Sequence, residues 1–292
     1  MTPRKFGLIA GWGRYPVVVA EQLVRDGHDV YCLAVKGHAD EKLNEICTDV
    51  KEIGVAKVGA QIRYFKKNGV KQATMAGKIF KTLLFERWSW WKHLPDVGFW
   101  RYFSRQFLLG SADRKDDTLL GTYTIAFQKH GITLAPATDY APDLLVKKNL
   151  MGKRSLTTSE KKDVEFGWNL AKQMGALDVG QSVAVKTQAV LAVEAVEGTD
   201  ECIRRAGQLC PAGGFTVVKV AKPQQDMRFD VPTIGLGTLK TMKETGASVL
   251  AVEAEKTIII DEPEVIRFAN DHRIKIIAVE EHEMSGFVET AA

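Results

Sequence analysis

The sequence predicts an α/β protein of two domains, and three observations support this. Short apolar runs typical of strands alternate with helical patterns in both halves of the chain. The length of 292 residues suits two domains, at roughly 100 to 200 residues each. Apolar residues make up 45% and charged residues 26% of the chain, which is ordinary for a globular protein and argues against long disordered stretches.

The first half of the chain opens with a βαβ pattern. The strand KFGLIA is followed by a helix from about Pro16 to Gly27 and by a second strand, DVYCLAV. A further helix, QIRYFKKNG, leads into the strand QATMAG. Because strands and helices alternate in this way, we expect a parallel sheet.

The second half begins with a helix that Thr158 or Ser159 is expected to cap and Gly175 to end. The strand-like runs that follow are SVAVK, AVLAVE, FTVVKVA, ASVLAVE, TIIID and IKIIAVE. We therefore expect the two halves to meet within residues 136–157.

Charge and composition exclude several classes of protein. A net charge of +4 without a block of like charges argues against nucleic-acid binding. The cysteines and histidines show no spacing typical of a zinc site, which favours reduced thiols. GWGRYP interrupts the first apolar run before it could act as a signal peptide, and no run approaches the roughly 18 residues of a membrane span. The expected location is the cytoplasm.

A charged stretch, KVAKPQQDMRFDVPTIGLGT, covers residues 219–238. As an extended segment it would place Asp226, Arg228 and Asp230 on one face and apolar side chains on the other. One interpretation is an edge strand with a solvated ladder of ion pairs. The other is a carboxylate and guanidinium cluster that binds a metal and a phosphate. This stretch alone supports both equally.

The turn after the first strand matches part of a dinucleotide-binding loop. Gly11 and Gly13 follow the strand directly, but Pro16 occupies the third glycine position of the GxGxxG pattern. Lys36 closes the second strand where an acidic residue would hold the ribose of NAD. NAD is therefore disfavoured, although a backbone turn at a helix N-terminus can still hold a phosphate or part of a nucleotide.

An aromatic stretch over residues 78–107 holds four of the six tryptophans, interleaved with Lys and Arg. These are Trp88, Trp90, Trp91 and Trp100. A helical core segment is one interpretation. A groove for acyl chains or a contact with a lipid surface is the other, because tryptophan favours places where one end is apolar and the other wet.

Acidic residues gather in two further places, and each set has a local explanation at a helix N-terminus. One set is Asp113, Asp116 and Asp117, and the other is Glu194, Glu197 and Asp200. Taken together with the acidic residues of the charged stretch, they supply the oxygen ligands that Mg²⁺ prefers.

A collinear series of motifs runs over nearly the whole chain, from Lys5 to about Val279. It comprises GLIAGWGRYP, AGKIFK, KDDTLL, LDVGQSVAV, EAVEGTDE and the KP, RFD and PTIG elements of the charged stretch. In this series the chain resembles the I-type UDP-2,3-diacylglucosamine pyrophosphatase family of lipid A biosynthesis.

The resemblance implies a Rossmann-like nucleotide-binding domain over residues 1–140 and a C-terminal α/β domain with a mixed sheet over residues 155–292. It implies a lipid-bearing sugar nucleotide as substrate, held between the two domains. It also implies Mg²⁺-dependent attack of water on the α-phosphorus, with Mn²⁺ as an alternative metal, to release UMP and 2,3-diacylglucosamine 1-phosphate. Contact with the inner membrane from the cytoplasmic side, and association into a homo-oligomer, would be compatible with that role.

The resemblance places the family's essential aspartate on Asp230. Asp230 would hold the metal or orient the water, with Asp226 as a second metal ligand. Arg228, Lys219 and Lys222 would face the diphosphate, since hydrolysis of a phosphoanhydride needs charge neutralised on the phosphate oxygens. The sequence does not divide these roles among the residues.

The resemblance also suggests residues that bind substrate. The glycine-rich opening of the family falls on Gly11 and Gly13, with Trp12 and Tyr15 as departures from the usual residues. The other expected substrate-binding residues are Lys78, Asp116, Asp117, Gln181, Thr199, Lys219 and Thr233.

Two other functions compete with hydrolysis. A nucleotide-sugar or lipid-binding protein without catalysis would use the same residues and release no UMP. An NAD-dependent oxidoreductase would bind nicotinamide at Gly11 and Gly13. Thermal shifts with UDP, UMP and NAD would separate this oxidoreductase from the hydrolase and from the binding protein, because a ligand of the native state raises the melting temperature.

Overall fold

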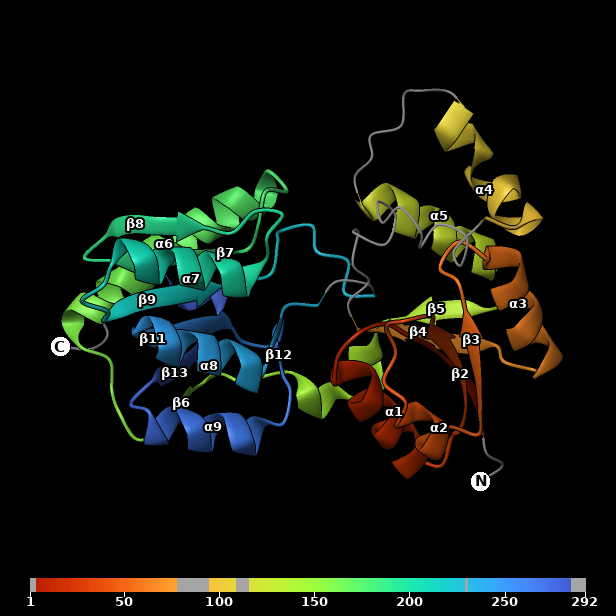
Figure 1. The fold of residues 1–292 in the computed structure, drawn as a ribbon, viewed down its shortest axis with the longest axis horizontal. Coiled ribbons are helices and arrows are strands. Elements are labelled where there is room, and N and C mark those ends of the chain that lie inside the picture. The colour runs from red at the N-terminus through yellow and green to blue at the C-terminus, as the bar shows by residue number, and fades with distance from the viewer. Residues whose placement is uncertain (1–3, 78–94, 109–115, 229–230, 285–292) are drawn as a thin grey trace. The chain divides into compact units, whose positions relative to one another are not determined.

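The computed structural model describes residues 4–77, 95–108, 116–228 and 231–284 (Figure 1). Within these ranges it does not describe the side chains at 105–108, 116–119 and 150. The chain forms two compact units. The first comprises Met1–Pro142 and Asp226–Phe229, and the second comprises Asp143–Gln225 and Asp230–Ala292.

The first unit is built on a five-stranded sheet in which all neighbouring strands are parallel. The strands are β1 (Lys5–Ala10), β2 (Asp29–Val35), β3 (Asp49–Ile53), β4 (Gln72–Ala76) and β5 (Thr133–Ala135). Their spatial order is β3-β2-β1-β4-β5. The chain thus builds outward from β1 in one direction and then returns to place β4 on its other side, the arrangement in which open α/β sheets bind ligands beyond the carboxyl ends of the strands.

Helices cover both faces of this sheet. They are α1 (Tyr15–Arg25), α2 (Leu43–Ile46), α3 (Val58–Lys67), α4 (Val97–Leu108) and α5 (Asp116–Gln128). Figure 1 shows α1 and α2 on one face and α3 and α5 on the other. Phe65 of α3 and Phe127 of α5 are fully buried against the sheet, and Gly7 of β1 makes room for Phe65, because an added Cβ would lie 2.8 Å from its ring.

The second unit contains a six-stranded mixed sheet in the order β6-β13-β11-β9-β7-β8. Its strands are β6 (Asn149–Met151), β7 (Ser182–Lys186), β8 (Ala189–Val193), β9 (Phe215–Lys219), β11 (Ala247–Glu253) and β13 (Lys275–Val279). β9, β11 and β13 are parallel, whereas β7, β8 and β6 pair antiparallel with their neighbours. A separate short pair joins β10 (Thr233–Ile234) to β12 (Ile258–Ile259).

The helices of the second unit are α6 (Thr158–Ala176), α7 (Thr199–Leu209), α8 (Leu236–Thr245) and α9 (Glu262–Asp271). Two hydrophobic cores lie on the two faces of the sheet, one packed by α6 and one by α7, α8 and α9. The cap of α6 is Thr157, one residue before the predicted position. Its hydroxyl accepts from Glu160 N, and the Glu160 carboxylate accepts from Thr157 N in return.

The predicted fold class is confirmed, because the structure contains a parallel sheet with helices on both faces and a mixed α/β sheet. Short 3-10 turns at Ala137–Asp139, Pro142–Leu144 and Glu281–Glu283 complete the elements. In the part of the chain that the structure describes, no helix is both long enough and apolar enough to cross a membrane.

Candidate functional site

The loop between β1 and α1 contains both predicted glycines. Gly11 N donates to Ala76 O of β4 at 2.8 Å, so the loop is tied to the neighbouring strand. Gly13 has φ +105°, and an added Cβ would meet no described atom within 4 Å. Gly13 therefore supplies a conformation that other residues rarely adopt, beside open space.

α1 begins directly after this loop, with Pro16 in its first turn and no acidic residue there. A helix N-terminus without its own carboxylate favours a bound anion. Trp12 is 54% exposed, whereas Tyr15 is buried, so the first departure from the family pattern changes the loop surface and the second changes the core.

Gly77, from the AGKIFK motif, packs against the same loop. It has φ +90°, and an added Cβ would lie 2.6 Å from Pro16 Cγ and 2.8 Å from Trp12 O. We call Gly11, Gly13 and Gly77 the glycine edge of the first unit. Lys78 follows it in sequence and lies outside the described residues.

In the second unit, polar side chains lie side by side across three strands. Ser182 begins β7 and pairs in register with Lys219, the last residue of β9. On the other side of β7, Glu194 follows β8 and its N–H donates to Ser182 O at 2.9 Å. Glu194, Ser182 and Lys219 form what we call the polar row, and all three are buried.

Thr199, the first residue of α7, connects the polar row. The Lys219 ammonium donates to Thr199 Oγ1 at 3.1 Å and to Thr233 O at 2.9 Å. The Thr199 hydroxyl lies 3.1 Å from Glu194 Oε1 and 3.3 Å from Ser182 Oγ. The structure thus brings together three predicted substrate-binding residues, Thr199, Lys219 and Thr233.

Gln181 lies next to the polar row in sequence and supports the same strands. Its carbonyl oxygen accepts from Val220 N at 3.0 Å, just beyond β9. Its side-chain Oε1 is buried without a hydrogen-bond partner among the described residues, as is Oε2 of Glu194. Buried acceptors are normally hydrogen-bonded, so these two atoms leave room for a donor from a water or a ligand.

Sequence reasoning missed Ser182 and gave Glu194 a local role at a helix N-terminus. The available signal was the alternation of SVAVK, which places Ser182, Ala184 and Lys186 on one face. Of the other acidic residues in that set, Glu197 pairs with Arg205 at 2.8 Å and Asp200 accepts from Thr238 at 3.2 Å.

Between Ala221 and Arg228 the charged stretch forms turns rather than an extended segment. Lys222 N donates to Gln225 Oε1 at 2.8 Å, and Gln225 N donates to Lys222 O at 3.0 Å. Pro223 stands at the second position of this turn, which its fixed φ favours. The predicted period-two arrangement of Asp226 and Arg228 is therefore wrong.

Asp226 and Arg228 nevertheless contact each other through a turn. Asp226 Oδ1 accepts from Arg228 N at 3.0 Å and from Nε at 2.9 Å, and Oδ2 accepts from Nη2 at 2.5 Å. These hydrogen bonds from Arg228 lower the pKa of the Asp226 carboxyl. The carboxylate stays ionised and engaged by the guanidinium.

The Lys222 ammonium lies 2.6 Å from Asp178 Oδ1, just beyond the C-terminus of α6. Contacts of the Lys219 ammonium include the Thr199 hydroxyl and the Thr233 carbonyl, and Lys222 and Arg228 each contact a carboxylate.

The described residues fit a divalent cation in part. Among them, no group of three His, Cys, Asp or Glu side chains gathers as a metal site would need. The Asp226 carboxylate is held by Arg228, so it is a weak candidate ligand as it stands. Asp230 lies outside the described residues. Asp116 and Asp117 begin α5, and their side chains are not described.

The described end of the aromatic stretch forms α4, which has two different faces. Phe103 is buried and stacks on Phe99 at a centroid distance of 4.5 Å. Trp100 is 49% exposed and Val97 is 86% exposed on the other side. The core interpretation holds for one face of α4, while Trp88, Trp90 and Trp91 lie outside the described residues.

Comparison with known proteins gives consistent matches along the chain. The model described as the LpxI N-terminal domain matches residues 5–144, and that of the LpxI C-terminal domain matches residues 147–277. The chain is 28% identical over 287 residues to a protein of Caulobacter vibrioides named UDP-2,3-diacylglucosamine pyrophosphatase LpxI, covering 96% of this chain and 99% of that protein. The chain belongs to the LpxI family.

Proposed function

We propose that the protein hydrolyses UDP-2,3-diacylglucosamine to UMP and 2,3-diacylglucosamine 1-phosphate in lipid A biosynthesis. The observation that carries this proposal is the match of both LpxI domains in order over the chain, together with a relative of nearly the same length that is named for this activity. The glycine loops of the first unit and the buried cation of the second unit each suit an anionic substrate, as the predicted pyrophosphatase class requires.

The glycine edge is proposed to hold the phosphate end of the uridine nucleotide. The first turn of α1 contains no acidic side chain that would compete with a bound anion. At Gly13, an added Cβ would meet no described atom within 4 Å. This assigns nucleotide affinity to backbone geometry rather than to a charged side chain.

Lys219 is proposed to stabilise the negative charge that develops on the phosphate oxygens during cleavage. Its ammonium is oriented by Thr199 and Thr233, so little reorganisation is needed at the moment of reaction. Burial strengthens its effect, because a charge acts more strongly at low local dielectric.

Asp230 is proposed as the residue that holds Mg²⁺ or orients the water, on the basis of the resemblance. Mg²⁺, or Mn²⁺ in its place, would supply further neutralisation of phosphate charge when bound. Arg228 and Lys222 are proposed to assist from the same loop, and Asp226 to keep Arg228 in place.

The protein is proposed to work in the cytoplasm and to contact the inner membrane peripherally, since the proposed substrate carries two acyl chains. Support comes from α4, whose first residues expose Val97 and Trp100 and include no acidic residue in the first turn. Sedimentation with anionic vesicles should decrease when Trp100 is replaced by Ser, and unchanged sedimentation would exclude α4 as the contact.

Product analysis tests the proposed reaction. The purified protein, incubated with UDP-2,3-diacylglucosamine and Mg²⁺, should release UMP and the sugar 1-phosphate in equal amounts. Binding without UMP release would favour the non-catalytic alternative. In water enriched with oxygen-18, the predicted attack on the α-phosphorus places the label in UMP, whereas label in the sugar phosphate would assign the attack to the β-phosphorus.

A further inference from the structure

A second buried carboxylate lies at the same sheet edge as the polar row. Glu253 is the last residue of β11 and is 1% exposed. The preceding residue, Val252, pairs in register with Lys219 of β9. Glu253 therefore lies one strand away from the proposed catalytic cation.

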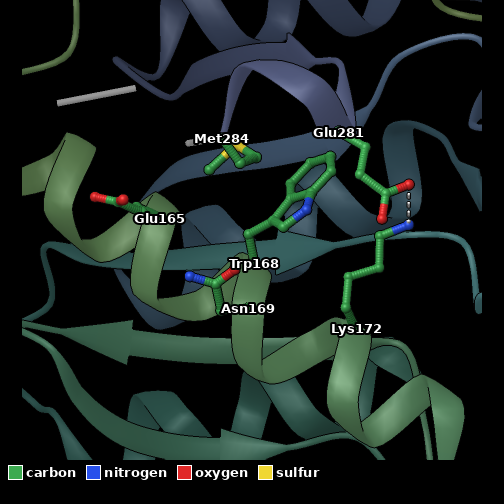
Figure 2. A pocket seen from close by; sticks show the side chains of 6 residues that line it. All are labelled: Glu165, Trp168, Asn169, Lys172, Glu281 and Met284. Atoms are coloured by element: carbon green, nitrogen blue, oxygen red, sulfur yellow. Dashed lines mark hydrogen bonds and ion pairs between the residues drawn. The ribbon is translucent and has the colours of Figure 1, made fainter. Parts of the chain in front are cut away.

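Two lysines neutralise this carboxylate. Lys172 Nζ lies 2.9 Å from both oxygens of Glu253, and Lys256 Nζ lies 2.8 Å from Oε1. Figure 2 shows that Lys172 also points toward Glu281 and lies beside Trp168. These three residues line a cavity of about 290 Å³. These ion pairs explain how a carboxylate can be buried here, since burial without partners would be costly.

The Glu253 carboxylate has a further contact, with an uncharged backbone N–H group. Glu253 Oε2 accepts a hydrogen bond from Ala221 N at 2.8 Å. Ala221 lies two residues beyond the end of β9 and directly before Lys222, where the chain turns toward Asp226 and Arg228. Val220 N is held in turn by Gln181 O. The start of this loop is thus fixed by two hydrogen bonds, one to Glu253 at the end of β11 and one to Gln181 just before β7.

We propose that Glu253 is a positioning residue for the reaction: through Ala221 N it sets the direction in which the loop bearing Lys222 and Arg228 leaves β9. This rests on the proposed function, because the loop matters for turnover only if those residues act in hydrolysis. Misplacing a catalytic group by about 1 Å can cost up to about 100-fold in rate.

Two conservative variants separate positioning from charge. Glu253→Asp keeps the negative charge, and the flexible lysines can follow it, but its carboxylate is one methylene too short for the fixed Ala221 N. Glu253→Gln keeps the reach and an acceptor oxygen but loses the charge. If Glu253 positions the loop, Glu253→Asp should reduce turnover more than Glu253→Gln does. If Glu253 only balances charge, Glu253→Gln should reduce turnover more.

The experiment measures kcat, KM and melting temperature for both variants with UDP-2,3-diacylglucosamine. For Glu253→Asp we expect kcat to fall about 10- to 100-fold with KM changed by less than about threefold. For Glu253→Gln we expect a lower melting temperature and a kcat within about threefold of the wild type. A kcat of the Glu253→Asp protein equal to or above that of the Glu253→Gln protein overturns the proposal.

Lys172→Met is the matched control, since it removes an ion pair of Glu253 and leaves the bond to Ala221 N. It should lower the melting temperature and keep kcat near that of the wild type. Loss of kcat equal to that of Glu253→Asp would show that stability alone governs turnover, and would also overturn the proposal.

Hydrogen exchange of the peptide spanning residues 220–228 supplies a readout independent of activity. We expect protection of this peptide to be retained in Glu253→Gln and reduced in Glu253→Asp, and the reverse order contradicts the proposal. If the wild type releases no UMP, the proposed function fails, while the exchange order still decides whether Glu253 fixes the loop.

Discussion

The carboxyl edges of the two sheets are built from different materials. In the first unit the edge consists of the backbone at Gly11, Gly13 and Gly77, and the first turn of α1 contains no acidic residue. In the second unit it consists of buried ionisable side chains, with Lys219 and Glu253 on adjacent strands. Backbone geometry suits a charge that is already present on a ligand, whereas oriented buried charges suit one that develops during a reaction.

This difference divides the expected effects of mutation. Changes at the glycine edge should act on nucleotide affinity and therefore on KM. Changes at the edge of the second unit should act on kcat, because they remove interactions made in the transition state.

Metal removal should give the largest effect. Treatment with EDTA is expected to abolish UMP release, and Mg²⁺ or Mn²⁺ should restore it, since the candidate ligands are carboxylates and oxygen donors prefer these ions. UMP binding, measured by calorimetry after the same treatment, should persist if the glycine edge holds the nucleotide without metal. Full activity after exhaustive chelation would remove the metal from the mechanism.

Asp230→Ala should reduce kcat on the order of a thousandfold or more, because it removes a metal or water ligand assigned by the resemblance. The circular dichroism spectrum and UMP affinity should remain close to those of the wild type. Near-normal turnover would exclude Asp230 from the chemistry.

Lys222→Met should reduce kcat by about tenfold, less than the loss of a residue at the reacting centre. The control is Asp178→Asn, which breaks the same ion pair but leaves the lysine charge in place. If Lys222 faces the diphosphate, the asparagine variant should keep most of its activity. Equal losses in both variants would instead assign Lys222 to anchoring the loop.

Gly13→Ala should give the smallest effect, a rise in KM of about fivefold or somewhat more with little change in kcat, because a side chain at φ +105° costs roughly 1 to 3 kcal/mol of backbone strain, only part of which falls on the nucleotide. Gly131→Ala is the control. Gly131 has φ +76° and equally open space, but it lies before β5, at the opposite edge of the same sheet. If the two variants raise KM alike, general destabilisation explains the result and the glycine edge has no special role.

The sequence predicted the fold class because long apolar runs such as DVYCLAV and ASVLAVE lie in sheet interiors, where the pattern reflects burial directly. It missed β3, whose DVKEI sequence has three charged residues among five, and β5, which has three residues. Pairing with a neighbouring strand stabilises such segments, and this tertiary effect is invisible in a local pattern.

Among the residues that the motifs suggested, Lys219, Thr199 and Thr233 contact one another in the structure, and their part in substrate binding stays a prediction. Glu194 could not be assigned, because its contact with Thr199 depends on the register of β7 and β8. The extended interpretation of Asp226 and Arg228 rested on a local alternation of charged and apolar residues, whereas the described chain turns at residues 227–228. Glu253 ends an ordinary buried strand, and the sequence gives no sign that its partner is the amide of Ala221.

The most direct test of the division between the two edges is the turnover of Lys219→Met. We predict that kcat falls about 100- to 1000-fold while UMP affinity changes by less than about threefold. Lys186→Met is the control for folding, because the Lys186 ammonium also donates to a backbone carbonyl, that of Gly213. Lys186 is the last residue of β7, whereas Lys219 pairs with the first residue of that strand. Two results for a folded Lys219→Met protein would contradict the account. One is a kcat within about threefold of that of the Lys186→Met protein, and the other is a loss of UMP affinity in proportion to the loss of turnover.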